Sequence, residues 1–205
     1  MKKLSGKDLT PKQREYLEYI DAPDRDSINS NWNPADRKVL RLFLGEPKSS
    51  YSTQCENSKI ESVRLRDRLV TRSVGPFRVT GVDVAVASLA IALKEVEKTH
   101  PELYKILGSA GMLCVRKVRG AEVPSIHSWG CAIDFTIGGV LDPYGDGTVQ
   151  KGLLDLYSVL KKHGWYWGAS FKKEDGMHFE LSAQRLRTLL NLSGQALTNY
   201  LKQSV

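Results

Sequence analysis

The sequence lacks long hydrophobic runs, and this absence excludes a class of protein. None of its apolar stretches approaches the roughly 20 residues that a membrane-spanning helix requires, so we expect no membrane insertion. The first residues, MKKLSGKDLTPKQREYLEYI, include lysines but no apolar segment behind them. Because a Sec signal peptide needs such a segment, we expect synthesis in the cytoplasm without a signal peptide.

Cysteine is also scarce. The three cysteines, Cys55, Cys114 and Cys131, are odd in number and widely spaced, and no two of them form a CxxC pair. This pattern favours reduced, mostly buried thiols over a disulfide framework. It also argues against a zinc cluster built from cysteines.

The composition is that of an ordinary globular protein with an excess of positive charge. The 205 residues are 41% hydrophobic and 26% charged, enough for one good-sized domain or a domain with a small cap. A net charge of +7 favours an anionic partner such as nucleic acid, a membrane surface or an acidic cell wall. The basic residues are spread along the chain without a nucleic-acid-binding motif, so we expect no nucleic acid partner.

Capping signals divide the chain into two parts. Thr10-Pro11 with Gln13 forms a capping box that predicts a helix over KQREYLEYI, and Asn33-Pro34 predicts a second helix that Gly45 ends. A polar loop follows. We expect residues 1–75 to form a helical N-terminal extension, with a boundary at Gly75-Pro76, and residues 76–205 to form a second domain, which contains the motifs described below.

The second part mixes helices and strands. Helical periodicity covers VDVAVASLAIALKEVEK, and GLLDLYSVLKKHG and AQRLRTLLNL are also predicted helices. GMLCVRKV, CAIDFTI and HFEL are predicted strands. Because the elements do not alternate regularly as βαβ units, we expect an α+β fold in which helices pack on a small antiparallel sheet.

The strand CAIDFTI places a carboxylate on an open surface. Asp134 shares its face with the small residues Ala132 and Thr136, while the bulky apolar side chains point the other way. Gly130 permits a tight turn between His127 and Asp134, so both side chains can converge on one ion. A catalytic zinc site needs a third protein ligand and an open position. Of the other histidines, His178 is the best candidate.

Two motifs carry a resemblance to a known family. Ser125-x-His127-x-x-Gly130-x-Ala132-x-Asp134, followed by Asp175-x-x-His178, resembles the zinc D-alanyl-D-alanine carboxypeptidases. Their relatives include D-Ala-D-Ala dipeptidases and phage L-alanyl-D-glutamate endolysins, which cut peptide bonds in bacterial cell-wall stems. The resemblance covers roughly residues 77–181. It implies Zn²⁺ held by His127, Asp134 and His178.

The resemblance also implies catalytic and substrate-binding residues. Asp175 takes the place of the catalytic carboxylate, which is a glutamate in many relatives, and the aspartate is more similar to the endolysin branch. The arginine expected to bind substrate or the oxyanion is Arg116, on the predicted strand before the first motif, with Arg119 as a second substrate-binding candidate. Ser125 is expected to contact substrate or a neighbouring group. Glu180 either orients a ligand or forms a surface salt bridge.

Two further features have weaker interpretations. LDPYGDGT resembles a calcium loop through Asp142 and Asp146, but two EF-hand ligands are missing and a turn-rich loop is favoured. Trp165 and Trp167 lie near the second motif, where they either line the cleft or fill the core, the commoner outcome.

These observations predict a zinc-dependent metallopeptidase that hydrolyses peptidoglycan. We expect a phage or prophage endolysin of the L-alanyl-D-glutamate type, acting as a monomer on the cell wall or in the periplasm after release from the cytoplasm. A bacterial D-alanyl-D-alanine carboxypeptidase is the alternative enzyme. A non-catalytic wall-binding or phage structural module is the alternative from another class, although such a module has no need of Asp175.

Overall fold

The computed structural model describes residues 9–203 of the chain. The helices are α1 (Pro11–Glu15), α2 (Arg37–Leu44), α3 (Val63–Arg66), α4 (Asp83–Thr99), α5 (Pro101–Ile106), α6 (Lys151–Leu160), α7 (Ala183–Leu190) and α8 (Gly194–Lys202). The strands are β1 (Tyr19–Asp21), β2 (Leu69–Ser73), β3 (Arg78–Val82), β4 (Leu107–Gly111), β5 (Ala132–Ile137), β6 (Val140–Leu141), β7 (Thr148–Gln150), β8 (Trp165–Trp167) and β9 (His178–Leu181).

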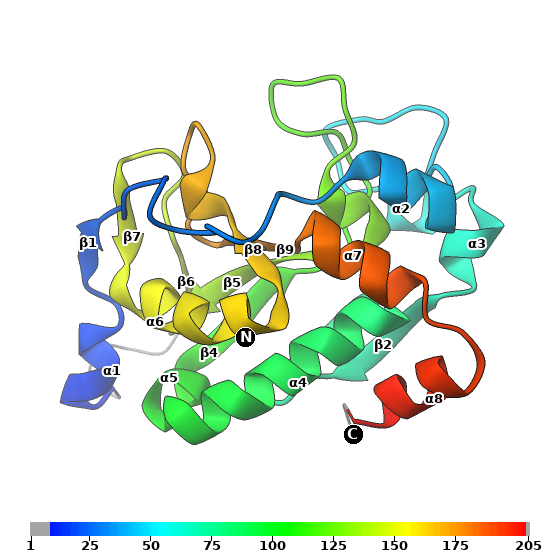
Figure 1. The fold of residues 1–205 in the computed structure, drawn as a ribbon. Helices are drawn as coiled ribbons and strands as arrows, with labels where there is room; N and C mark the ends of the chain where they lie inside the picture. The colour runs from blue at the N-terminus through cyan, green and yellow to red at the C-terminus, as the bar shows by residue number, and fades with distance from the viewer. Residues whose placement is uncertain (1–8, 204–205) are drawn as a thin grey trace.

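The largest sheet is antiparallel and has the strand order β4-β5-β9-β8, with β6 paired to β5. The described residues also form two smaller antiparallel pairs, β1-β7 and β2-β3. Figure 1 shows α4 and α6 crossing in front of the sheet. The fold is therefore α+β, as the sequence predicts.

The main sheet is apolar on the face that packs into the core. Phe135 of β5 meets Phe179 of β9 edge to face, with 5.4 Å between their ring centroids. Trp165 and Trp167 of β8 are fully buried, so both fill the core. Because side chains alternate along a strand, the opposite face of β5 and β9 is left for polar groups.

Three predicted elements differ from the structure. The first helix ends at Glu15, because the carbonyls of Tyr16 and Glu18 accept hydrogen bonds from the first N–H groups of α6 and the chain continues into β1. The cap of α2 is Asp36, whose side chain accepts from the Lys38 N–H, and not Asn33. The strand predicted over GMLCVRKV lies earlier, at β4, and residues 112–118 form a loop with one bridge, between Lys117 and Pro124.

The prediction of reduced cysteines is wrong for two of the three. Cys55 and Cys114 form a disulfide across 59 residues, with their Cα atoms 4.9 Å apart. The segments beside them run together, because the Glu56 N–H donates to the Val115 carbonyl at 3.0 Å. Cys131 is free and buried, as expected. The pairing depends on contacts between distant segments, which cysteine spacing does not reveal.

The N-terminal residues contribute strands as well as helices. β1 pairs with β7, and β2 pairs with β3 from Leu69↔Val82 to Ser73↔Arg78, so Gly75-Pro76 lies in the turn of a hairpin. The division into 1–75 and 76–205 stays a prediction. Among the described helices, none combines the length and the apolar character needed to cross a membrane.

Candidate metal centre

Strand register and one tight turn bring the three predicted ligands together. Asp134 of β5 lies directly opposite His178 of β9, so both side chains leave the same face of the sheet. His127 lies in a short 3-10 helix, Ile126–Trp129, which ends at Gly130 with φ +62°. A Cβ at Gly130 would lie 2.7 Å from the Cα of Gly81, so only glycine allows this turn to pack on β3.

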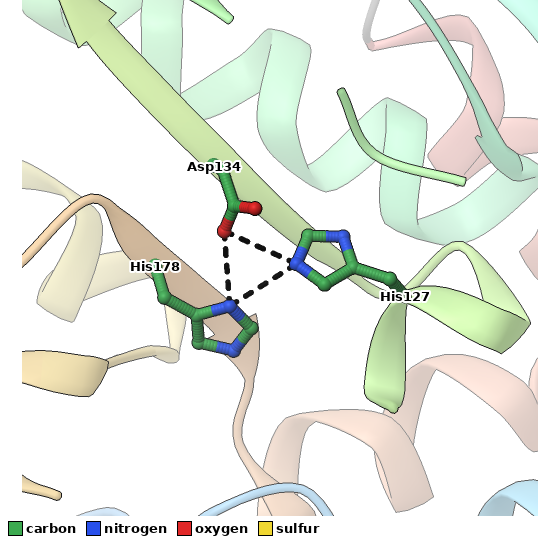
Figure 2. Close-up of side chains that lie close together, drawn as sticks. All are labelled: His127, Asp134 and His178. Atoms are coloured by element: carbon green, nitrogen blue, oxygen red, sulfur yellow. Dashed lines mark hydrogen bonds and ion pairs between the residues drawn. The ribbon is translucent and has the colours of Figure 1, made fainter. Parts of the chain in front are cut away.

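The facing atoms of these side chains form a nearly equilateral triangle (Figure 2). His127 Nε2 lies 3.1 Å from Asp134 Oδ1 and 3.1 Å from His178 Nδ1. The third side, from His178 Nδ1 to Asp134 Oδ1, is also 3.1 Å. Both histidines are buried, and all three side chains line a cavity.

In each histidine, the hydrogen bond of the outer ring nitrogen, the one that points away from the triangle, determines whether the inner nitrogen carries a proton or a lone pair. His127 Nδ1 lies 2.9 Å from the Met112 carbonyl oxygen, which can only accept, so this nitrogen carries the proton. His178 Nε2 lies 3.0 Å from Glu180 Oε2 and donates to that carboxylate in the same way. In the neutral rings, His127 Nε2 and His178 Nδ1 therefore turn lone pairs toward each other and toward Asp134, an arrangement that a cation stabilises.

The residues fit a metal ion of zinc's size and preference. Ligands about 2.0–2.2 Å from a tetrahedral zinc lie about 3.3–3.6 Å apart, within a few tenths of an ångström of the separations in the triangle. Two imidazoles and one carboxylate form the three-ligand type of set that leaves a position open for chemistry. Within residues 9–203, this is the one group of three or more side chains placed to hold a metal ion.

The electrostatics of the triangle favour positive charge. Burial alone would raise the pKa of Asp134, but the two histidines hold that pKa well below its ordinary value. Burial alone would lower the pKa of His178, but hydrogen bonds with Asp134 and Glu180 raise it to about 10. The carboxylates thus create a site where a cation between the three side chains is favoured.

Asp175 reaches the same cavity from a turn before β9. The turn is closed by a 3.1 Å hydrogen bond from the His178 N–H to the Asp175 carbonyl, and the Trp167 indole donates to the Gly176 carbonyl at 2.7 Å. Asp175 Oδ1 is buried and has no hydrogen-bond partner in the described part of the chain. Burial raises the pKa of Asp175 above its ordinary value, which suits a group that exchanges a proton.

The predicted substrate-binding residues line a cavity of about 780 Å³ that also contains the triangle and Asp175. Arg116 is in the loop and not on a strand, and its carbonyl accepts from the Ser125 N–H at 2.9 Å. The Ser125 hydroxyl accepts from the His127 N–H at 3.4 Å and caps the turn that carries this histidine. Arg119 lines the cavity with an exposed side chain.

Of the two alternatives for Glu180, the structure supports orientation of a ligand, and it also adds cavity residues that sequence reasoning missed. Glu180 is 3% exposed, and its two oxygens accept from His178 and from the Ala35 N–H at 2.7 Å, so it is a buried partner of the ligand and not a surface ion pair. The Met112 carbonyl has no side-chain signal in the sequence. The missed residues include three cations, for which the net charge of the chain was the only hint, and a tyrosine, for which there was none: Arg37, Lys172, Lys173 and Tyr144.

The acidic loop after β6 is not a metal site of this kind. Asp142 is buried, its Oδ1 accepts from the Gln150 N–H at 2.7 Å, and burial raises its pKa to about 7. Asp146 Oδ1 accepts from the Thr148 N–H at 2.9 Å. Both carboxylates accept from backbone N–H groups of the strand that follows, β7, which agrees with the turn-rich interpretation.

The chain was compared with families of known proteins, with curated proteins and with solved structures. Residues 119–181 match a family model described as D-alanyl-D-alanine carboxypeptidase. The matched segment contains the triangle, Asp175 and Glu180, and it leaves Arg116 and the N-terminal part outside. No curated protein and no solved structure gives a significant match to the chain. Together with the triangle of potential metal ligands, the family match supports a peptidase that acts on peptidoglycan.

Proposed function

We propose that this protein is a zinc-dependent peptidase that cleaves a stem-peptide bond of peptidoglycan, of the L-alanyl-D-glutamate type cut by phage and prophage endolysins. The observation that carries the proposal is the triangle of His127, Asp134 and His178 beside the carboxylate oxygen of Asp175 that has no hydrogen-bond partner. Hydrogen bonds to the Met112 carbonyl and to Glu180 hold the two histidine rings in place. A module that only binds the wall does not need the Asp175 oxygen.

The three ligands would hold the zinc, which when bound lowers the pKa of a water molecule from 15.7 to about 7 and polarises the scissile carbonyl. Asp175 takes a proton from the attacking water at Oδ1 and gives it to the nitrogen of the leaving amine. Arg116 donates hydrogen bonds to the developing oxyanion or to a substrate carboxylate. Ser125 keeps His127 in position through the capped turn and also faces the substrate.

Two observations support action outside the cytoplasm. The Cys55–Cys114 disulfide is of a kind that persists in oxidising environments and is rare in the cytosol. The net charge of +7 favours association with an anionic cell wall. We therefore propose that the protein acts as a monomer on the wall or in the periplasm, after release from the cell interior.

A D-alanyl-D-alanine carboxypeptidase is the second candidate, and the description of the matching family favours it. The same chemistry serves both reactions, because each hydrolyses one amide bond beside the metal. They differ in which amide enters the cavity.

Digestion of purified peptidoglycan, followed by mass spectrometry of the released ends, tests the proposal. The endolysin type exposes new N-terminal D-glutamate and C-terminal L-alanine, whereas a carboxypeptidase releases free D-alanine only. Asp175→Asn protein provides the control for a contaminating hydrolase. If zinc-loaded protein binds the wall without exposing new ends, both enzymatic proposals fail and the wall-binding module is favoured.

A further inference from the structure

The cavity carries more positive charge than its own carboxylates neutralise. Its acids, Asp134, Asp175 and Glu180, gather at the metal end, where Asp134 and Glu180 already bond to histidines. None of the cations lining the cavity forms a salt bridge with any residue between 9 and 203; these cations are Arg37, Arg116, Arg119, Lys172 and Lys173. Unneutralised cations around a cavity favour an anionic occupant.

Two of these cations are held over one aromatic ring. The Lys173 amine lies 4.5 Å from the centre of the Tyr144 ring, and the Arg119 guanidinium lies 5.6 Å from it. Both distances are within the range of cation–π attraction. Tyr144 is 39% exposed, so the ring and its two cations lie where the cavity meets solvent.

The surrounding backbone fixes this arrangement. The Gly145 N–H donates to the Glu174 carbonyl at 3.1 Å, and the Gly147 N–H donates to Glu174 Oε1 at 3.0 Å, which ties the tyrosine loop to the lysine loop. Gly145 has φ +76°, and a Cβ there would lie 1.9 Å from Lys173 Cε. The aliphatic part of Lys173 therefore lies directly over Gly145, and its amine is directed along the loop toward Tyr144.

We propose that Arg119, Lys173 and Tyr144 form a carboxylate-binding subsite, which selects peptides carrying a free carboxylate next to the scissile bond. The proposal rests on the peptidase function proposed above and adds a specificity determinant to it. A carboxylate between the two cations forms charge-assisted hydrogen bonds, which are roughly twice as strong as neutral ones. In a stem peptide, the D-glutamate beside the proposed bond offers such a carboxylate, and its amidation would remove the charge.

The test compares two synthetic stem peptides that differ only in that group, one with the free carboxylate and one with a carboxamide. Binding of each to full-length, zinc-supplemented Asp175→Asn protein is measured by calorimetry, so that no cleavage is required. We expect the carboxylate peptide to bind about tenfold more tightly, the size of effect typical of a hydrogen bond to a charged group. Raising the salt concentration should reduce the preference, because these cations are exposed to solvent.

Substitutions in the same Asp175→Asn protein test whether the three proposed residues cause the preference for the carboxylate peptide. Adding Arg119→Gln and Lys173→Gln should weaken binding of the carboxylate peptide to the level of the carboxamide peptide. Arg72→Gln with Arg78→Gln removes the same charge from the exposed β2–β3 hairpin and should retain the preference. Tyr144→Leu should reduce the preference partly, because it removes the ring that positions both cations.

Equal binding of the two peptides, no binding of the carboxylate peptide, or a preference that survives the double substitution would each overturn the subsite, even if the protein cleaves peptidoglycan. A preference that depends on Arg119 and Lys173 in a protein that cleaves no stem peptide would support the subsite while the proposed function fails. The two proposals are therefore tested separately.

Discussion

At the scale of single residues, the candidate site depends on atoms that hold the ligands as much as on the ligands. Glu180 accepts from His178 with one oxygen and from the Ala35 N–H with the other, while the Met112 carbonyl fixes His127. Such partners set the tautomer and the orientation of a metal-binding imidazole. Once His178 Nδ1 has given up its proton, the inner nitrogens can therefore act as ligands without rotation of the rings.

The purified protein is expected to contain about one zinc ion per chain, the number for a single three-ligand site. His127→Ala should lose the metal, because two remaining ligands do not hold it firmly. The control variant, His100→Ala, removes a histidine that lies outside the triangle, between α4 and α5. This variant should keep the zinc ion. Metal analysis after gentle purification provides the measurement, and full zinc content in His127→Ala would remove this residue from the ligand set.

Glu180→Ala is expected to weaken zinc binding by about 10- to 100-fold, the usual effect of losing a hydrogen-bond partner of a ligand. Glu180→Gln should lose less zinc affinity than Glu180→Ala, because the amide oxygen of glutamine can still accept a hydrogen bond from His178 Nε2. Competition with a chelator measures the affinities, and circular dichroism of the zinc-saturated variants confirms that they are folded. Unchanged affinity in folded Glu180→Ala protein would show that Glu180 does not position the ligand.

Asp175→Asn is expected to retain zinc and fold but to lose about 100-fold or more in turnover, as removal of a general base usually does. The neighbouring Glu174→Gln is the matched control, because Glu174 bonds to the Gly147 N–H through an oxygen that glutamine keeps. Turnover of a stem peptide and zinc content are measured on both variants. If Glu174→Gln is the inactive one, the base has been assigned to the wrong acid.

At the scale of elements, the sequence correctly predicts those features that depend on residues close together in the chain, such as strand alternation and turns. Alternation in CAIDFTI places Asp134 on the open face, and the Asp-Gly step before His178 predicts the turn that carries Asp175. Contacts between segments far apart in the chain could not be predicted in this way. The Cys55–Cys114 disulfide, the Met112 carbonyl and the contacts of Tyr144 depend on how loops meet in space, and no spacing or periodicity records this.

The loop of residues 112–118 connects these contacts to the site, because it contains the Met112 carbonyl, Cys114 and Arg116. Removing the disulfide with Cys55→Ser and Cys114→Ser is expected to lower the free energy of unfolding by about 2–5 kcal/mol. Chemical denaturation provides the measurement. A thiol reductant should destabilise the wild type by a similar amount and leave the double variant unchanged; equal stability of both proteins would contradict the prediction.

At the scale of the whole molecule, the N-terminal part is joined to the site through several kinds of contact. The Ala35 N–H reaches Glu180, and the Trp129 indole, in the turn that carries His127, donates to the Gly45 carbonyl at 2.8 Å. Cys55 holds the Arg116 loop through Cys114. From these contacts we expect the positions of the ligands to depend on residues before Gly75, whereas the capping signals of separate helices favour a separable extension.

A fragment of residues 76–205 is therefore expected to be unfolded and to bind no zinc. It lacks β2, the partner of β3, and it loses the fully buried Leu40, Leu44 and Leu65. Burying three leucines contributes roughly 5–9 kcal/mol, which is comparable with the whole stability of a typical domain, about 5–15 kcal/mol. Circular dichroism, zinc content and cleavage of a small soluble stem peptide are compared between the fragment and the full chain. A folded fragment that holds zinc and cleaves the peptide would show that residues 1–75 are a separable extension, and the contacts of Ala35 and Gly45 would then be dispensable for the chemistry.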